Sequence, residues 1–167
     1  MSDLENLIRD IRRARMYTKD ILSHIDLTDW FRQPDEGVTH VAWQVGHLAA
    51  TQYALTLKRL RGEKADDAEM ISPELRRLFG KGSRPVPDPG SYPTPKDLRA
   101  VFDRVHEQVL DESSDWSKEL LDEATSDPPH PMFKTKGGAI RWSVQHEFIH
   151  IGQIGLLRRL LGATPLW

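Results

Sequence analysis

The sequence predicts an all-α protein, a four-helix bundle that forms a single domain over residues 1–167. In four long stretches, apolar residues recur at spacings of three and four, the pattern of amphipathic helices. No stretch gives a convincing alternation of apolar and polar residues of the kind that marks a set of strands. A chain of 167 residues is long enough to bury one core, and four amphipathic helices bury it best as a bundle.

The first helix is expected from Ser2 to His24, because nine apolar or small residues from Leu4 to Ile25 share one face. Ser2 is the expected N-cap, and Glu5, three residues later, completes a capping box. Proline and glycine then mark residues 26–37 as a connection.

The second helix is expected from Thr39 to Leu60, with Gly62 as its C-terminal stop. A long connection rich in glycine and proline comes next, over residues 62–93. A short helix is expected within it at Pro73–Phe79, capped by Ser72. Connections of this length in a compact domain often form a lid or an interface.

The third helix is expected to begin with Thr94 as its cap and Pro95 in the first helical position, and its apolar face continues to Val109. A second long connection, residues 125–138, contains three prolines and ends in two adjacent glycines. The fourth helix is expected from Ala139 to Leu161.

Composition narrows the function classes. The chain has no cysteine, so disulfides, cysteine metal sites and a catalytic cysteine are excluded, and any thiol must belong to a substrate or cofactor. A net charge of −2 gives no support for nucleic-acid binding. No apolar run approaches the ~18 residues of a membrane helix, and the N-terminus lacks the apolar core of a signal peptide. We therefore expect a cytoplasmic protein with no nucleic-acid or membrane partner.

The most informative segment lies in the fourth helix, where His146 and His150 stand four residues apart, about 40° from each other around the axis. Both imidazoles can reach one divalent metal ion from the same helix face. We expect that face to point into the core, together with the side chains of Trp142, Gln153, Leu157 and Leu160. A pair of structural histidines is the alternative interpretation.

The segment also matches H-E-x-x-H, the zinc-peptidase motif, so the third ligand distinguishes between two classes of enzyme. No His, Asp or Glu follows His150, which argues strongly against a peptidase of the usual kind. The third ligand must come from an earlier helix, and His47 in the second helix is the best candidate. Gly46 beside it would allow a neighbouring backbone to come close.

Four further residues are candidates for the site. Glu147 is a candidate general base, and a helix-surface carboxylate is its alternative role. Gln44 and Gln153 are candidates for orienting a ligand or substrate. His40 is expected either in the capping region of the second helix or at the rim of a substrate pocket. The remaining histidines, His24, His106 and His130, are expected to be structural or solvated.

Two motifs carry a resemblance to a known family. The second helix contains Trp43-Gln44-Val45-Gly46-His47-Leu48-Ala49, and the fourth contains His-x-x-x-His-x-Gly-Gln-Ile from His146 to Ile154. Together they resemble the DinB/YfiT-like superfamily over essentially the whole chain. The resemblance implies up-down-down-up connectivity, frequent homodimers, and a divalent metal, commonly nickel or zinc. It also implies that His47, His146 and His150 are the metal ligands.

Some members of that superfamily use low-molecular-weight thiols such as mycothiol or bacillithiol, as S-transferases or isomerases, and others have no known activity. Three neutral histidines leave coordination positions open for a thiolate or for water. Our leading prediction is a metal-dependent thiol S-transferase that acts on a small electrophile, with the thiol as co-substrate. The alternatives are a metal-dependent hydrolase and a non-catalytic metal-binding protein for stress response or partner binding.

Overall fold

The computed structural model describes residues 3–35, 37–125 and 130–166, and it confirms the all-α bundle. Its long helices are α1 (Asp3–Ser23), α2 (Val41–Tyr53), α6 (Pro95–Glu112) and α8 (Lys136–Leu160). Beyond two isolated β-bridges, these described ranges contain no extended pairing. None of their helices is both long and apolar enough to cross a membrane.

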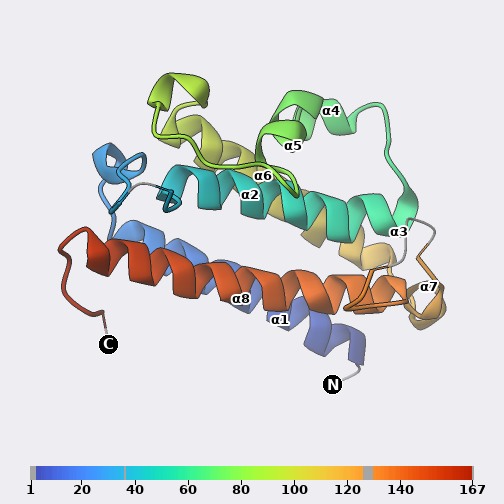
Figure 1. Cartoon of the computed structure of the whole chain (residues 1–167). Helices are drawn as coiled ribbons and strands as arrows, with labels where there is room; N and C mark the ends of the chain where they lie inside the picture. The colour runs from blue at the N-terminus through green and yellow to red at the C-terminus, as the bar shows by residue number, and fades with distance from the viewer. Residues whose placement is uncertain (1–2, 36, 126–129, 167) are drawn as a thin grey trace.

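The long helices pack as two pairs, α1 against α8 and α2 against α6, and α2 also contacts α8. Figure 1 shows that α1 and α8 run in one direction along the bundle, whereas α2 and α6 run in the other. This arrangement agrees with the connectivity that the family resemblance implied. Because α2 and α8 are neighbours, side chains from these two distant parts of the sequence meet inside the bundle.

The first half of the chain begins with α1, whose expected cap Ser2 lies outside the described residues. A 3-10 turn, η1 (Leu27–Asp29), lies in the first connection. His40, rather than Thr39, caps α2, because its side chain accepts a hydrogen bond from the Trp43 N–H. The capping role expected for His40 is therefore confirmed.

The expected second helix is continuous in space but not uniform. After α2 the chain makes a π-helical turn, η2 (Ala54–Lys58), and then a last α-helical turn, α3 (Arg59–Arg61). Gly62 ends the helix with a φ of 81°, a left-handed conformation that favours glycine. The π turn was not predicted, because only the short segment α3 comes after it and three residues are too few to show a shifted apolar pattern.

The long connection after α3 folds over α2 (Figure 1). It contains α4 (Asp67–Met70), the predicted α5 (Pro73–Phe79) and the 3-10 turn η3 (Pro89–Ser91). Buried Asp67 anchors it, because the carboxylate accepts hydrogen bonds from the Tyr53 hydroxyl at 2.9 Å and from Arg61 at 2.7 Å. This ion pair fixes the start of the connection on the helix that carries His47.

After α6 come the 3-10 turn η4 (Ser113–Asp115) and the short α7 (Lys118–Asp122). The fourth long helix starts three residues earlier than predicted. Thr135 is its N-cap and accepts a hydrogen bond from the Gly138 N–H at 3.1 Å. The two glycines, interpreted as the end of a loop, are thus in the first helical turn. Gly137 packs close to the backbone of Leu121, where a side chain would have little room.

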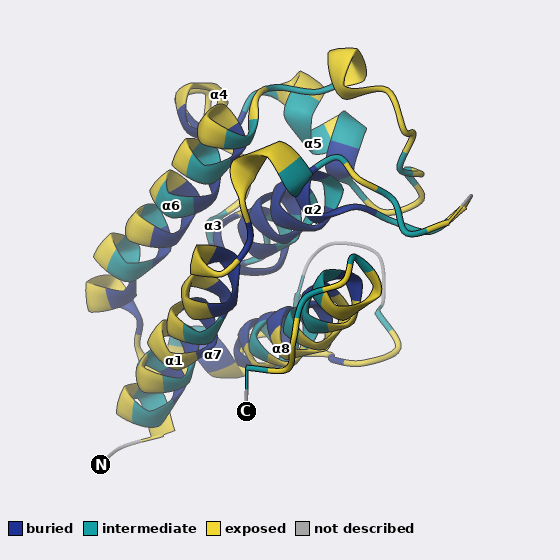
Figure 2. Ribbon diagram, turned by 90° about the vertical axis from the view of Figure 1, so that its left-hand side faces the viewer, coloured by how far each residue is buried: buried dark blue, intermediate teal, exposed yellow. Residues whose placement is uncertain are grey.

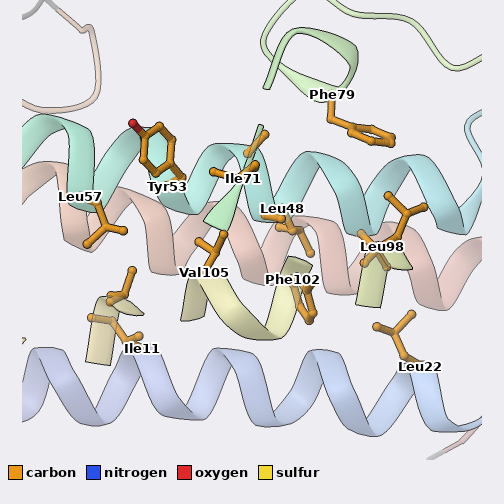
Figure 3. Packing of buried hydrophobic residues seen from close by; sticks show 14 of the residues in the cluster. Ile11, Leu22, Leu48, Tyr53, Leu57, Ile71, Phe79, Leu98, Phe102 and Val105 are labelled. Carbon is orange, nitrogen blue, oxygen red and sulfur yellow. The ribbon is translucent and has the colours of Figure 1, made fainter. Parts of the chain in front are cut away.

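The core lies between the inward faces of the four long helices. Figure 2 shows each helix buried on its inner side and exposed on its outer side, and Figure 3 shows the apolar side chains that meet there. Fully enclosed examples are Trp30, Phe102, Ile140 and Ile154. Truncating one of these large residues to alanine would cost about 2–5 kcal/mol of stability.

Candidate metal centre

Three histidines from two helices meet in the interior. The Nε2 atom of His146 lies 3.4 Å from Nε2 of His47 and 3.2 Å from Nε2 of His150. Ligand atoms of all three residues lie within 4.8 Å of one another. The structure therefore brings together the three residues that the sequence proposed as metal ligands, and the group they form could hold a metal ion.

Hydrogen bonds at the other ring nitrogens set the orientation of two of these rings. Nδ1 of His47 donates to the backbone carbonyl of Phe79 at 2.7 Å. Nδ1 of His150 donates to the side-chain oxygen of Gln44, whose amide nitrogen donates in turn to Thr39 at 3.3 Å. Because each neutral ring carries one hydrogen, the Nε2 atoms of His47 and His150 present lone pairs to the centre.

The three facing ring nitrogens have few hydrogen-bond donors between them. One hydrogen on His146 can satisfy only one of the two facing lone pairs, and the Thr51 hydroxyl, 3.4 Å from Nε2 of His47, is the further donor within reach. Three ligands at ~2.05 Å in a tetrahedral arrangement would lie about 3.4 Å apart, close to the two observed separations. The nitrogen atoms present thus fit a single divalent ion, with an open position for a substrate.

Burial keeps the three rings neutral, which metal ligation requires. Desolvation lowers the pKa of His47. Desolvation, with a further contribution from His47, lowers the pKa of His146 to about 4. Desolvation and the two neighbouring histidines lower the pKa of His150 to about 3. At neutral pH the metal-free site would therefore offer lone pairs rather than positive charges.

The position of His47 depends on Gly46 and on the long connection. A Cβ atom at Gly46 would lie 2.6 Å from three atoms of the Phe79 ring, so only glycine lets α5 pack this closely on α2. Figure 3 shows the Phe79 ring against α2. The close neighbour is thus a side chain, not the backbone that was expected. The Trp43 ring stacks on His47 from the other side, at 4.7 Å between centroids and an interplanar angle of 8°.

A cleft of about 720 Å³ opens beside the histidines. His47 and His146 line it from α2 and α8, together with Thr51, Trp142 and His130. The π turn η2 and α3 extend the α2 side of the cleft, and α5 with the chain that comes after it also lines the cleft. The long connection therefore serves as one wall of the cleft, in keeping with the functional role expected for it.

Glu147 is placed away from this cleft. The residue is 3% exposed, so it is not the surface carboxylate that was the alternative interpretation. The carboxylate pairs with Arg15 of α1 at 2.9 Å and accepts a hydrogen bond from Thr18 at 2.8 Å. The structure therefore does not bring Glu147 to the Nε2 atoms, and a general-base role has no geometric support.

The reason is the direction of the buried face of α8. Its buried residues, among them Ile140, Glu147 and Ile154, centre about 70° from His146 around the axis. His146 thus lies at the margin of that face, toward the cleft, while Glu147 lies near its middle. Two residues expected to face inward, Gln153 and Leu160, are instead exposed. Within the part of the chain that the structure describes, Gln153 has no hydrogen bond to the histidine cluster.

The other histidines differ from one another. Both ring nitrogens of fully buried His40 are engaged, with the Trp43 N–H and the Val86 carbonyl, so it is a structural residue rather than one at a pocket rim. His106 is buried beside Gln52, and His24 is solvated. His130 was expected to be structural or solvated, yet it lines the cleft. Only the fold, which returns the second connection to α8, could reveal this.

The fold and the site together define a helical-bundle protein with a three-histidine cluster suited to a divalent metal. A family model described as the DinB superfamily matches residues 10–154, and the chain belongs to that superfamily. The comparison with curated proteins gave no match. Membership of the superfamily agrees with the helical bundle and the histidine cluster.

Proposed function

We propose that this protein is a metal-dependent thiol S-transferase, in which His47, His146 and His150 hold a divalent ion such as nickel or zinc. A bound ion of this kind would lower the pKa of a substrate thiol and keep its sulfur as a thiolate at neutral pH. The chain contains no cysteine, so the thiol would come from a small co-substrate. A cleft of about 720 Å³ gives room for this thiol and a small electrophile together.

The observation that carries the proposal is that, among the described residues, no free carboxylate lies beside the histidines. Of the described residues that line the cleft, the acidic one is Glu63, and it pairs with Lys58 at 3.4 Å and Arg76 at 2.7 Å. Glu147 is committed to Arg15. Hydrolysis by an activated water usually relies on a general base, whereas a thiolate attacks without one.

The residues of the cleft suit a transfer step in which sulfur bonds to an electrophilic carbon. The leaving group departs with the electrons of the bond that breaks, and the proton of the thiol passes to solvent. His130 accepts a hydrogen bond at Nδ1 from the Met132 N–H, so its Nε2 carries the hydrogen and can donate one. A donor in the cleft favours a leaving group that gains negative charge.

The metal site can be tested before any reaction is known. Elemental analysis of the purified protein should find one nickel or zinc ion per chain. His150→Ala and His146→Ala should each abolish this stoichiometry, while His24→Ala, which removes a solvated histidine, should leave it unchanged. Circular dichroism would establish that the variants are folded. Unchanged metal content in both folded variants would refute the three-histidine site.

The reaction type can be tested on protein loaded with Ni²⁺. Titration with glutathione or N-acetylcysteine should produce a thiolate-to-nickel charge-transfer band. Conjugation to 1-chloro-2,4-dinitrobenzene, with release of chloride, should exceed the uncatalysed rate and disappear in His146→Ala. The proposal would be overturned if these and other common thiols gave no charge-transfer band and no turnover. Thiol-independent hydrolysis of ester or amide substrates would instead support the hydrolase.

A further inference from the structure

The cleft is strongly basic, although the chain as a whole carries a net charge of −2. Its described lining residues include five cationic side chains and one acidic side chain: Lys58, Arg59, Arg76, Arg77, Lys81 and Glu63. Glu63 pairs with Lys58 and Arg76, and the excess remains four positive charges. A concave surface lined by one sign of charge concentrates ligands of the opposite sign.

Arg59 is the most distinctive of these side chains. Its guanidinium lies over the Phe133 ring, 4.8 Å from the centroid, and this contact holds the head group in place. Its Nη1 atom is buried and has no hydrogen-bond partner among the described residues. A charged donor without an acceptor is costly, so a ligand oxygen that reached this guanidinium from the cleft would stabilise it.

The π turn η2 sets the direction of Arg59. In an uninterrupted α-helix, Arg59 would lie about 120° from His47 around the axis, twelve residues further on. A π turn accommodates one extra residue and so rotates the residues after it back by about 100°. Arg59 therefore lies within about 20° of His47, and both side chains line the same cleft. With one of the twelve residues taken up by the π turn, His47 and Arg59 are about 16–17 Å apart along the axis.

His130 shows that these charges act inside the cleft. Desolvation lowers its pKa, and the positive charges of Arg59 and Lys81 lower it further. His130 is thus a neutral donor between the histidine cluster and the basic end. The cleft has a metal site at one end and a cationic site at the other, with neutral side chains between them.

We propose that the cleft takes an elongated substrate whose reacting atom lies at the histidine cluster and whose oxyanion group, a phosphate or carboxylate, binds Arg59 with Arg77 and Lys81. This inference rests on the proposed function for the role of the reacting atom. The oxyanion belongs either to the thiol or to the electrophile, and both sources require the same arginine. Guanidinium groups bind such oxyanions in bidentate fashion.

The first experiment measures oxyanion binding without metal or reaction. Inorganic pyrophosphate is titrated calorimetrically into the metal-free protein, where binding should weaken as salt is raised. Arg59→Gln, which keeps most of the side-chain stem, should weaken the affinity at least tenfold, and Arg77→Ala combined with Lys81→Ala should do the same. Lys96→Ala, which removes a charge outside the cleft, is the matched control. Equal affinity in Arg59→Gln and the control would overturn the inference, as would no binding at millimolar concentrations.

The second experiment locates the oxyanion and separates the two proposals. Coenzyme A and pantetheine share a thiol arm, but only coenzyme A carries phosphates. In Ni²⁺-loaded protein, coenzyme A should give a charge-transfer band at a concentration at least tenfold lower, and Arg59→Gln should equalise the two thiols. If the thiols are equal while pyrophosphate binding requires Arg59, the oxyanion belongs to the electrophile. If neither coenzyme A nor pantetheine gives a band while pyrophosphate binding still requires Arg59, the thiol S-transferase proposal fails and the oxyanion site stands.

Discussion

Gln44 accepts a hydrogen bond from Nδ1 of His150, although the two residues are 106 positions apart in the sequence. This contact fixes the ring so that Nε2 faces the centre. Gln44→Ala should therefore lower metal affinity about 10- to 100-fold without unfolding the protein. Chelator competition would measure the change. Gln44→Glu, which keeps an acceptor, should retain most of the affinity, and Gln145→Ala, at an exposed position on α8, should have no effect.

Gly46 should be intolerant of substitution. Gly46→Ala would place a Cβ atom 2.6 Å from the Phe79 ring, so α5 must move and take the acceptor of His47 with it. We expect a loss of about 1–3 kcal/mol in the free energy of unfolding, together with weaker metal binding. Gly152→Ala on α8 is the control, since nothing lies within 4 Å of its added Cβ. That change should stabilise the protein by about 0.5–1 kcal/mol. Equal effects of the two substitutions in urea unfolding would contradict this account.

The Arg15–Glu147 pair should matter for stability rather than for the metal. Arg15 also donates to the Phe102 carbonyl and to Gln52, so loss of the carboxylate leaves a buried cation with incomplete compensation. Glu147→Gln should cost about 3–5 kcal/mol in urea unfolding, while the folded variant keeps its bound metal. Glu107→Gln, at an exposed position of α6, should cost little. A stable Glu147→Gln variant that binds metal but has lost thiol transfer would instead restore Glu147 as a general base.

Acid should destabilise the metal-free protein. Burial, with help from Arg15, lowers the pKa of His106 to about 3, whereas an unfolded histidine has a pKa near 6.5. Below pH ~6.5 the unfolded chain therefore binds a proton that the folded state excludes. Above pH 6.5 this difference has no effect, and as the pH falls from 6.5 toward 3 the free energy of unfolding decreases by about 1.4 kcal/mol per pH unit. His146 and His150 act in the same direction.

Urea unfolding at pH 7.5, 6.0 and 5.0 would measure this slope. His106→Gln should reduce the slope of unfolding free energy against pH by roughly 1.4 kcal/mol per pH unit, which corresponds to one proton. The reason is that glutamine does not titrate in this range. A stability that is constant from pH 7.5 to 5.0 in the metal-free protein would contradict the prediction.

The sequence was sufficient to predict the long helices, because apolar spacing and capping residues are local features. It was also sufficient to predict that His47, His146 and His150 meet, because a four-residue spacing and the lack of a downstream ligand restrict the choices. It did not give the rotation of α8, which depends on what α1 and α2 present to it. A helical wheel centred on His146 therefore placed Gln153 inside and left Glu147 undecided. The basic cleft was missed for a related reason, since Arg59 and Arg77 come together only when the long connection folds back over α2.

The π turn η2 has a consequence for the length of the chain. One residue between Ala54 and Lys58 is surplus to a regular helix. Deleting this residue would restore an ordinary α-helix. Arg59 and Leu60 would keep their present directions, because the π turn already offsets the extra residue that the deletion would remove. The distance between the two ends of the cleft would barely change. This helix is therefore a place where the protein should accept a shortened backbone, unlike most helix interiors.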